Sequence, residues 1–590
     1  MESALTGTVT RLARMRTAPL ILELDLTEGI LEARPADPLS AVLSRHQLSL
    51  ADIVSGLRQA RADDRVKALV VKVGGRPIGL GMVQELRGAI QRFRAAGKLT
   101  VAWAESFGEF SAGNVPYYLA TAFETIYLQP SGDLGLTGLA VERVFLRGAL
   151  DKLGVTFEVG ARHEYKSAAE QLTERGFSVP AREATERMTE SITAQLAEAV
   201  AERGQISAED AAGLVGSGPY LADQALAAGL VDALGYRDEV YADVRKRAGS
   251  EATLVYLSRY QRSRELVQRA RRMTAPRQPA VALIHATGAI RRGRSGRSPM
   301  SGSAMGSDSI TAAIRAAAAD PTVRAIVLRV NSPGGSYVAS DSIWREVVRV
   351  RGAGKPVVVS MSDVAASGGY FISMAADAIV AQPGTVTGSI GVVVGKAVLG
   401  ELLGKAGVST DSIVLGQHAA MFSTSHPFTD EDWALINSWL DHIYADFTGK
   451  VAAGRRLSAE RVHELARGRV WTGADALERG LVDELGGVET AAEIARRRAG
   501  LPGTAPLVPY PRTSPLDRLW PASSSEDRRA ASVAGAGALG AAGASGMAAV
   551  AGALGADLLA ESWGPAWRLA LKCGLPQEGP LMLPGSWTFH

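Results

Sequence analysis

The chain has 590 residues, of which 46% are hydrophobic and 21% are charged. An apolar fraction near one half can bury large cores, so a wholly disordered chain is excluded, and the length predicts two to about four domain-sized units. The 64 basic and 61 acidic side chains leave a net charge of +3, so we expect no nucleic-acid partner. With Cys573 as the single cysteine and eight scattered histidines, we expect no internal disulfide, no metal site and no cofactor.

The first predicted element is a strand at Leu20–Leu26, where apolar and acidic residues alternate as in a half-buried strand. The stretch Met1–Arg16 before it carries three arginines, but the apolar run that follows is short and is interrupted by Glu23 and Asp25. We therefore expect neither a secretory signal nor a spanning helix here.

The middle of the chain contains the same pattern twice, about 250 residues apart, which is far longer than the period of a solenoid repeat. The matched pairs are Ala62–Val73 with Ala319–Val330, Tyr117–Pro130 with Tyr370–Pro383, and Gly229–Gly235 with Gly480–Gly486. Three matches in the same order indicate a duplicated domain.

Within the second copy, short β-branched runs alternate with amphipathic helical patterns. We expect buried strands at Ala325–Val330, Pro356–Met361 and Ala378–Ala381, and helices at Asp341–Val350 and Gly369–Ala376. This alternation predicts an α/β domain with parallel strands and right-handed crossovers.

Three further segments have biased compositions. Arg245–Arg277 holds ten basic and two acidic residues, which indicates a solvated connecting helix or, as the alternative, contact with an anionic membrane surface. Arg291–Ser309, rich in Gly, Ser and Arg, predicts a mobile loop or lid. Ala530–Ala556 is uncharged and long enough to span a membrane, but Ala and Gly transfer weakly into lipid, which favours a loose helix or tail.

A candidate nucleophile occurs in the second copy alone. Ser367 stands between Ala366 and Gly368, where the strand at Pro356–Met361 runs into a helix. Small neighbours would let a substrate carbonyl approach its hydroxyl, and the helix N-terminus would offer N–H groups to an oxyanion. The first copy has Asn114 at this position. On local spacing alone, an ordinary helix-capping serine is the alternative.

The second candidate feature is the pair Gly334 and Gly335 in Asn331–Ser336, directly after a predicted strand. Adjacent glycines bring backbone amides close to a ligand, which suits half of an oxyanion hole, with the amide of Gly368 as the other half. A tight turn is the alternative. The first copy has Gly74–Pro77 here and lacks the pattern.

A nucleophilic serine needs a base, and four histidines of the second copy are best interpreted as structural: His418, His426, His442 and His463. The motifs resemble instead those of the signal peptide peptidase A family, also called protease IV. The stretches that carry the resemblance are Asn331–Ser336, Ala366–Tyr370, Thr387–Gly391, Glu164–Glu170 and Pro180–Ala184. By this resemblance Ser367 is the nucleophile, Lys166 is the general base and Ser389 helps to hold the lysine amine. Burial without a carboxylate partner would lower the pKa of Lys166 from about 10.4 to about 7, so that it could accept a proton.

The resemblance covers roughly residues 20–500 and implies two tandem domains of the ClpP/crotonase type, α/β superhelical (ββα) spirals produced by internal duplication. We expect an N-terminal domain with the lysine at 1–240, a basic linker at 241–279, a C-terminal domain with the serine at 280–500, and an Ala/Gly/Pro-rich tail at 501–590.

The family also implies a serine endopeptidase that degrades remnant signal peptides and other extended apolar peptides through an acyl-enzyme. It implies homo-oligomers, tetramers in the double-length form. Because the family's usual N-terminal anchor is missing, we expect peripheral membrane association, with the cytoplasm as the alternative. Two other functions stay open: a crotonase-like acyl-CoA enzyme, which would use carboxylates, and a non-catalytic membrane-associated scaffold.

Overall fold

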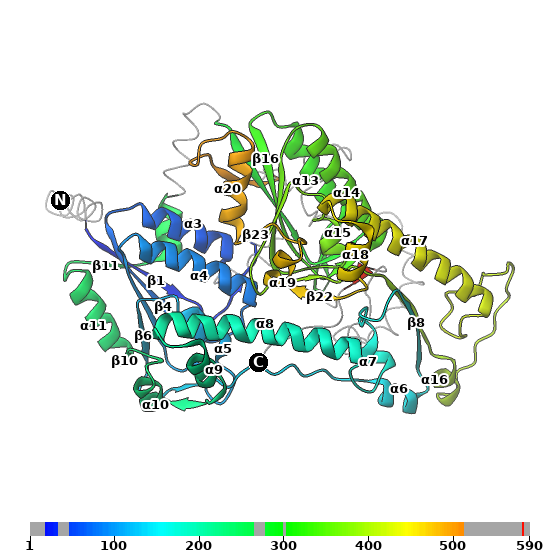
Figure 1. Ribbon diagram of the computed structural model, residues 1–590, viewed down its shortest axis with the longest axis horizontal. Coiled ribbons are helices and arrows are strands. Elements are labelled where there is room, and N and C mark those ends of the chain that lie inside the picture. The colour runs from blue at the N-terminus through cyan, green and yellow to red at the C-terminus, as the bar shows by residue number, and fades with distance from the viewer. Residues whose placement is uncertain (1–17, 34–46, 265–277, 299–301, 512–580, 583–590) are drawn as a thin grey trace, which may run out of the picture. The chain divides into compact units, whose positions relative to one another are not determined.

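The computed structural model describes residues 18–33, 47–264, 278–298, 302–511 and 581–582 (Figure 1). The chain divides into two compact units. Unit 1 comprises Met1–Ala140 and Glu190–Arg277 with the last two residues, and unit 2 comprises Val141–Thr189 and Gln278–Thr588. Residues 141–189, which include Lys166, therefore belong to the same unit as Ser367. The domain boundaries expected from the repeat stay a prediction.

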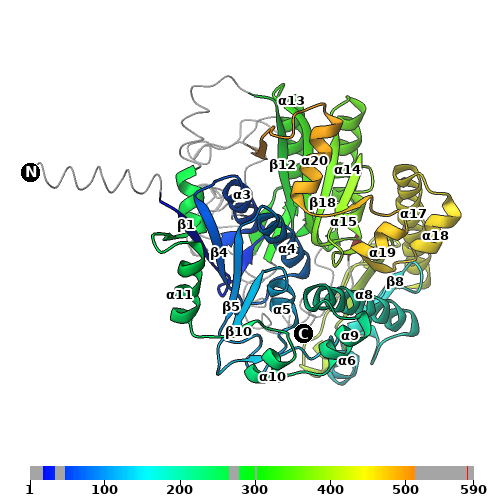
Figure 2. The ribbon, with the colours of Figure 1, turned by 60° about the vertical axis from the view of Figure 1, so that its left-hand side comes forward.

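Unit 1 is built on a parallel six-stranded sheet in the order β10-β6-β5-β4-β1-β11. Its strands are β1 (Leu20–Asp25), β4 (Val66–Lys72), β5 (Leu99–Ala104), β6 (Thr125–Leu128), β10 (Ala233–Leu234) and β11 (Thr253–Tyr256). Helices α3 (Leu50–Arg61) and α4 (Leu80–Ala95) pack on one face and α11 (Arg237–Ala248) on the other (Figure 2). Because helices cover both faces of the sheet, successive residues of β1 are buried. The strand expected at Leu20–Leu26 is therefore present nearly to its last residue, but the expectation that it is half-buried is wrong.

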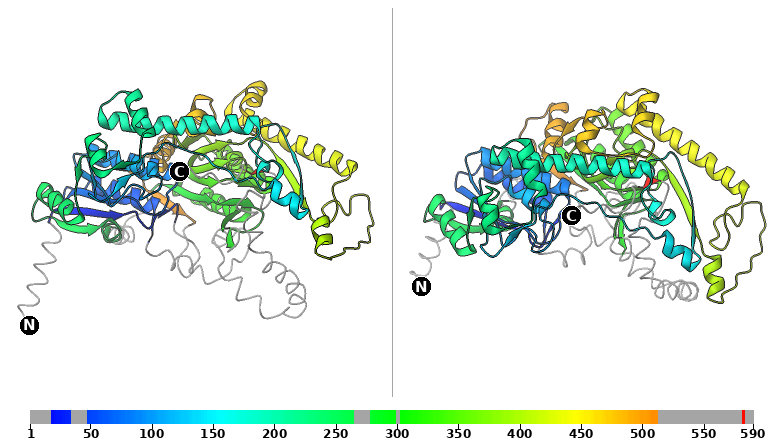
Figure 3. Two further views of the ribbon diagram at one scale, coloured as in Figure 1. Left: turned by 90° about the horizontal axis from the view of Figure 1, so that it is seen from below. Right: turned by 60° about the horizontal axis from the view of Figure 1, so that its bottom comes forward.

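Unit 2 has the same plan. Its main sheet follows the order β22-β20-β18-β16-β12-β24, with β19 beside β18 and β23 beside β19, and only the β20–β22 pair of this sheet is antiparallel. Its strands are β12 (Ala280–Thr287), β16 (Val323–Ser332), β18 (Val357–Ala366), β19 (Ala378–Ala381), β20 (Val386–Gly388), β22 (Val470–Thr472), β23 (Glu484–Leu485) and β24 (Leu507–Tyr510). Helices α13 (Ser307–Ala319), α14 (Tyr337–Gly352) and the long α17 (Asp430–Arg455, yellow in Figure 3) pack on one face, and α20 (Val488–Arg498) on the other.

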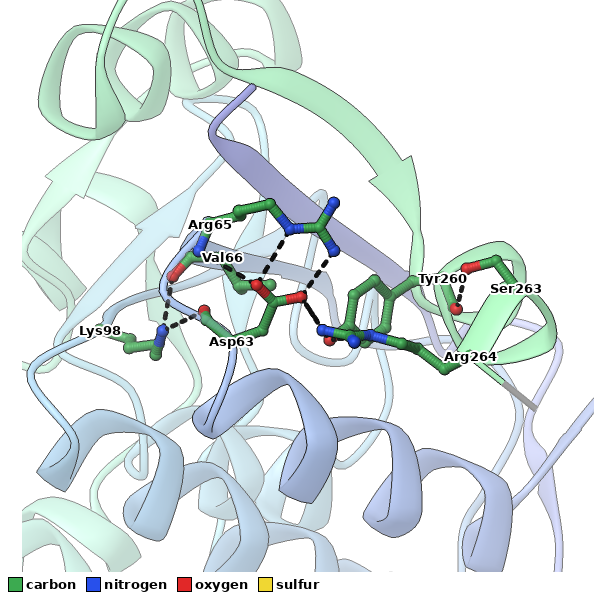
Figure 4. Close-up of polar contacts among 7 residues, drawn as sticks. All are labelled: Asp63, Arg65, Val66, Lys98, Tyr260, Ser263 and Arg264. Carbon is green, nitrogen blue, oxygen red and sulfur yellow. Dashed lines mark hydrogen bonds and ion pairs between the residues drawn. The ribbon is translucent and has the colours of Figure 1, made fainter. Parts of the chain in front are cut away.

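An aspartate clasp closes one end of the unit 1 sheet (Figure 4). The buried Asp63 lies between α3 and β4, and its carboxylate accepts hydrogen bonds from Arg65 at 2.8 and 3.1 Å, from the Tyr260 hydroxyl at 3.1 Å, and from Arg264. Lys98 Nζ donates to the Asp63 carbonyl oxygen at 2.7 Å. The clasp ties the segment after β11 to the loops before β4 and β5.

Unit 2 repeats this clasp at the matching position. The Tyr510 hydroxyl donates to the Asp320 carboxylate. Lys355 Nζ donates to the carbonyl oxygens of Ala317, Ala318 and Asp320 at 3.1, 2.7 and 3.2 Å. Such details recur in both units, and the expected α/β class with an internal duplication is confirmed.

Two segments expected to be a linker helix and a mobile loop contain strands. β11 lies within Arg245–Arg277 and pairs with β1. Within Arg291–Ser309, β14 (Gly296–Ser298) and β15 (Gly302–Gly306) pair with each other, and β15 also pairs with β13 (Ala289–Arg291). Backbone pairing with neighbouring strands, which composition does not reveal, orders these residues.

Some expectations fall outside the described residues. They concern the uncharged run Ala530–Ala556, Cys573, and the part of the basic segment after Arg264. In the part of the chain that the structure describes, none of the helices combines the length and the apolar character needed to cross a membrane.

Candidate active site

Ser367 lies at the turn from β18 into the short helix α15 (Gly368–Phe371). Its backbone has φ +54° and ψ −114°, a conformation that costs energy in a residue with a side chain. Its N–H donates to the Gly388 carbonyl oxygen at 2.8 Å, which helps to hold the turn. The Ser367 side chain accepts no capping hydrogen bond from α15, so it is not the ordinary helix cap considered as the alternative.

The side chain of Lys166 reaches this serine. Lys166 precedes α7 (Glu170–Thr173) in unit 2, and its Nζ lies 2.9 Å from Ser367 Oγ. The same Nζ lies 3.0 Å from Ser389 Oγ and 3.1 Å from the Ser389 carbonyl oxygen. Ser389 follows β20 with φ +51°, and its N–H donates to Arg469 O at 2.7 Å. The structure thus brings together three residues that lie far apart in the sequence.

The amine of Lys166 is buried without a counter-charge. The residue is 5% exposed, and Ser367 and Ser389 are fully buried. Burial lowers the pKa of Lys166 from 10.5 to about 7, and no charged group among the described residues offsets this effect. A substantial fraction of the amine is therefore uncharged at neutral pH.

A strand of two glycines lies against the helix that follows the serine. Gly334 and Gly335 form β17, with φ +106° and +147°, and both are buried. A Cβ on Gly368 would stand 3.1 Å from Gly334 Cα and 3.2 Å from Gly335 N, so the backbones of β17 and α15 are in contact. A Cβ on Gly335 would overlap the Ile290 carbonyl oxygen at 2.1 Å. Both the positive φ and this close approach require glycine.

Comparison with known proteins identifies the family. The family model for peptidase family S49 matches residues 92–251 and 349–502, one segment from each copy of the repeat. The chain belongs to peptidase family S49. It is a serine-type endopeptidase, as the motifs predicted.

Relatives within S49 match most of the chain. It is 33% identical over 459 residues to the serine protease SPPA, chloroplastic, of Arabidopsis thaliana. The aligned region covers 77% of this chain and 66% of that protein. It is 34% identical over 461 residues to Protease 4 of Salmonella typhi, which covers 76% and 72%. A solved structure of a ClpP1 variant from Listeria monocytogenes is similar over 34% of this chain and 90% of that one, with 14% identity and a TM-score of 0.23. The chain thus matches part of the length of each relative.

The matching position in unit 1 of this S49 chain lacks these groups. Asn114 begins α5 (Asn114–Ala120), and its Nδ2 donates to the Gly138 carbonyl oxygen at 2.8 Å. Beside Asn114 there remains a pocket of about 20 Å³, lined by apolar side chains that include Ile192 and Leu196. This volume is about that of one water molecule.

Sequence reasoning missed the groups that position the lysine. Gly468, with φ +86°, lies so close to the lysine backbone that a Cβ would stand 2.5 Å from Lys166 N. A Cβ on Gly391 would stand 3.3 Å from Lys166 Cδ. The neighbouring Tyr165 donates its N–H to Arg467 O at 3.2 Å. None of these residues is of a catalytic type. Gly391 and Tyr165 lie within stretches that carry the family resemblance, whereas Gly468 stands outside them, between two arginines.

A second missed contact fixes the side chain next to the lysine. The Tyr165 hydroxyl donates to the Glu183 carboxylate at 2.7 Å, and Arg469 forms an ion pair with Glu183 at 2.9 Å. The Arg469 guanidinium also lies 4.8 Å from the centre of the Tyr165 ring. These contacts fasten the lysine segment to the loop before β22. His418, one of the histidines expected to be structural, has its Nδ1 2.6 Å from a carboxylate oxygen of Asp432.

Proposed function

We propose that this S49 peptidase uses Ser367 as its nucleophile, Lys166 as its general base and Ser389 as the residue that orients the lysine. The observation that carries the proposal is the 2.9 Å distance between Lys166 Nζ and Ser367 Oγ, which is within reach for direct proton transfer. A pKa of about 7 supports it, because an amine with that pKa can both accept and return a proton near neutral pH.

The first half-reaction forms an acyl-enzyme. A neutral amine has two N–H groups and one lone pair, and the two N–H groups would donate to the hydroxyl and carbonyl oxygens of Ser389. The lone pair then accepts the Ser367 proton while Oγ attacks the carbonyl carbon of the scissile bond. The attack leaves a negative charge on the former carbonyl oxygen of the substrate. This oxyanion would be held by the N–H of Gly368 and by the N–H of Gly334 or Gly335. When the C–N bond breaks, Lys166 returns the proton to the leaving amine.

The second half-reaction releases the acyl group. Lys166, again neutral, takes a proton from a water molecule whose oxygen attacks the ester carbon. The same amides hold the oxyanion, and Lys166 then protonates Ser367 Oγ as the ester bond breaks. Atoms balance with one peptide bond and one water consumed, and no cofactor enters the cycle.

Extended apolar peptides, remnant signal peptides among them, are the proposed substrates. The motif resemblance to signal peptide peptidase A supports this class. The short two-glycine strand beside the serine also supports it, because an extended peptide can pair with such a strand through main-chain hydrogen bonds.

We further propose a homo-oligomer, with a tetramer as the expected form. Exposed apolar residues between α16 (Gly400–Lys405) and α17 support it, because Ile413 is 96% and Leu415 is 89% exposed. Light scattering coupled to gel filtration would give the mass, and replacing both residues with aspartate should lower it. A monomeric wild-type mass would rule the proposal out.

Peripheral attachment to a membrane is the proposed location. The basic stretch at the end of α11, with Arg245, Lys246 and Arg247, supports it because anionic lipids attract such clusters. Membrane fractions should contain the protein and release it in high salt. Recovery in the soluble fraction at low salt would favour the cytoplasm instead.

The roles of Ser367 and Lys166, which together form the proposed catalytic dyad, are tested by cleavage of apolar peptides. Ser367→Ala and Lys166→Ala should each lower kcat/KM by at least about a thousandfold. The matched controls are Ser373→Ala, at a buried serine that donates to Gly369 O, and Lys396→Ala, at a lysine that donates to Met421 O. Full cleavage in either dyad variant would refute the assignment.

The wild-type protein and the Ser367→Ala variant also test the two alternative functions, the crotonase-like acyl-CoA enzyme and the non-catalytic scaffold. Turnover of an acyl-CoA ester by the wild type and by Ser367→Ala alike would favour the crotonase-like enzyme. Absence of any cleavage by the folded wild-type protein would favour the scaffold.

A further inference from the structure

The segment that leads into β22 lies between the two parts of the chain that hold the amine of Lys166. On one side it contacts the residue before the lysine, because the N–H of Tyr165 donates to the Arg467 carbonyl oxygen at 3.2 Å. On the other side, the N–H of Ser389 donates to the Arg469 carbonyl oxygen at 2.7 Å. The backbone of Arg469 therefore helps to place the serine whose oxygens accept hydrogen bonds from the amine.

The side chain of Arg469 returns to the lysine segment. Its Nη1 lies 2.9 Å from the Glu183 carboxylate and 3.4 Å from the Tyr165 hydroxyl, and this hydroxyl donates to the same carboxylate at 2.7 Å. The guanidinium also lies 4.8 Å from the centre of the Tyr165 ring and 4.6 Å from the centre of the Trp471 ring. A planar guanidinium that is both stacked and paired with a carboxylate has few other orientations open to it. We call Arg469, Tyr165 and Glu183 the arginine clamp.

The arginine clamp keeps one charge state across the pH range of the proposed reaction. The hydrogen bond from Tyr165 and the charge of Arg469 hold the pKa of Glu183 below its ordinary value, so this carboxylate stays charged from about pH 5 upward. Burial raises the pKa of Tyr165 above its ordinary value of about 10, so the hydroxyl keeps its proton near neutral pH. A change of rate with pH between these limits therefore does not come from the clamp.

We propose that Arg469 is a positioning residue of the peptidase, which fixes the spacing between Lys166 and Ser389. Its carbonyl oxygen places Ser389, while its guanidinium holds Tyr165 and thereby the backbone that carries the lysine. The inference rests on the proposed function of Lys166 as the general base. A displacement of about 1 Å at a reacting group can slow a reaction about a hundredfold, so a residue that touches neither the serine nor the amine can control the rate.

The first test replaces the guanidinium of Arg469 with a neutral amide. In Arg469→Gln, kcat for an apolar peptide should fall about a hundredfold while KM stays close to the wild-type value, because Lys166 serves both half-reactions and the clamp contains none of the groups proposed to bind the oxyanion. The midpoint of the kcat/KM profile should also rise by about one pH unit, because a loosened lysine segment admits water to the amine.

Arg479→Gln is the matched control for this substitution. Arg479 lies 4.2 Å from the centre of the same Trp471 ring, and it donates to the Asp475 carbonyl oxygen at 2.9 Å. Its side chain is 23% exposed, against 19% for Arg469, so the two substitutions remove similarly buried guanidinium groups. The control should match the wild type in kcat and in the midpoint.

A second test uses milder changes at the other two members of the clamp. Tyr165→Phe removes the hydroxyl between Arg469 and Glu183, and Glu183→Gln removes the charge of a side chain that is 53% exposed. Each should lower kcat about threefold and raise the midpoint. In the Arg469→Gln background, Tyr165→Phe should cost nothing further, because the two residues act through one contact. Circular dichroism must first show that each variant is folded, and the two mild variants decide if Arg469→Gln is not.

The outcomes separate this inference from the catalytic proposal. If Lys166→Ala abolishes cleavage while folded Arg469→Gln matches the wild type, the inference is overturned and the assignment of the base stands. A lower kcat with an unchanged midpoint also overturns it, because lost stability alone reduces the amount of active enzyme. The same holds if Tyr165→Phe costs equally much with and without Arg469. Full cleavage by Lys166→Ala would instead overturn the catalytic proposal and this inference together.

Discussion

In the proposed mechanism Lys166 acts only when its amine is uncharged, and the residues around it favour that form. Burial lowers the pKa of Lys166 to about 7, whereas Ser389 supplies neutral oxygen acceptors in place of a carboxylate. A carboxylate at that position would stabilise the charged amine and remove the base from use near pH 7. The uncharged side chain of Ser389 therefore helps to keep Lys166 available as a base near pH 7.

The pH dependence of cleavage follows from this pKa. Below about pH 7 Lys166 binds a proton and cannot accept one from Ser367, so kcat/KM should rise tenfold per pH unit up to about pH 7 and then level off. Initial rates at low substrate concentration between pH 5 and pH 9 would measure it. A value of kcat/KM that still rises tenfold between pH 8 and pH 9, as an ordinary lysine pKa of about 10.4 would give, would contradict the proposed role.

Gly335 should tolerate no side chain. Gly335→Ala would place a Cβ 2.1 Å from the Ile290 carbonyl oxygen at φ +147°, so β17 must move away from the serine. We expect kcat/KM to fall by about a hundredfold or more, the usual effect of losing an oxyanion donor. Gly352→Ala is the matched control, because its Cβ would meet nothing within 4 Å and alanine suits a helix. Equal activity in both variants would show that β17 does not bear on catalysis.

Among the elements, the aspartate clasp of unit 1 joins a helix, two strand ends and the segment after β11 without any role in the proposed chemistry. Burial alone would raise the pKa of Asp63, but the hydrogen bonds from Arg65 and the charge of Arg264 hold it well below its usual range. The charged carboxylate therefore stabilises the folded state at every pH above its unfolded pKa of about 4. Because unit 2 repeats the tyrosine and lysine contacts at Asp320, we regard the clasp as part of the duplicated scaffold.

The clasp predicts a pH-dependent loss of stability on mutation. Asp63→Asn should lower the free energy of unfolding by about 2 kcal/mol at pH 7, because Arg65 and Arg264 lose their carboxylate partner. The difference should narrow below about pH 4, as the wild-type carboxylate begins to bind a proton in the unfolded chain. Urea unfolding followed by circular dichroism at pH 7 and pH 3 would measure both values. The exposed neighbour Asp64, changed to asparagine, is the control, and an equal effect at the two positions would rule out the clasp.

The elements also show where prediction from sequence succeeded. β-branched runs predicted β16, β18 and β19, each within five residues at either end, because these strands are buried on both faces and read as apolar runs. The turn at Ser367 was predictable because small residues interrupt the pattern between a strand and a helix. β25 (Leu581–Met582) was not, because these two residues have no local pattern and pair with β17, a strand far away in the chain.

At the scale of the whole molecule, the duplication indicated which copy carries the serine, since a residue present in one copy alone stands out against a shared scaffold. Comparing the copies could not reveal what holds Lys166. Gly468 acts by lacking a side chain, and in a chain with 64 glycines the role of one more glycine is not evident from sequence. The Tyr165–Arg469 contact joins residues 304 positions apart, which no local pattern can predict.

The duplication also predicts one reactive serine per chain. Among the described residues, unit 1 has Asn114 and a water-sized pocket where unit 2 has Ser367 and its amides. A fluorophosphonate phosphonylates activated serines, with fluoride as the leaving group, and should therefore add a single adduct to the intact protein, at Ser367. Mass spectrometry of the whole chain and of its fragments would count and place the adduct. Ser367→Ala should stay unlabelled and Ser373→Ala should be labelled as the wild type is, whereas two adducts per chain would mean that unit 1 has kept a catalytic site as well.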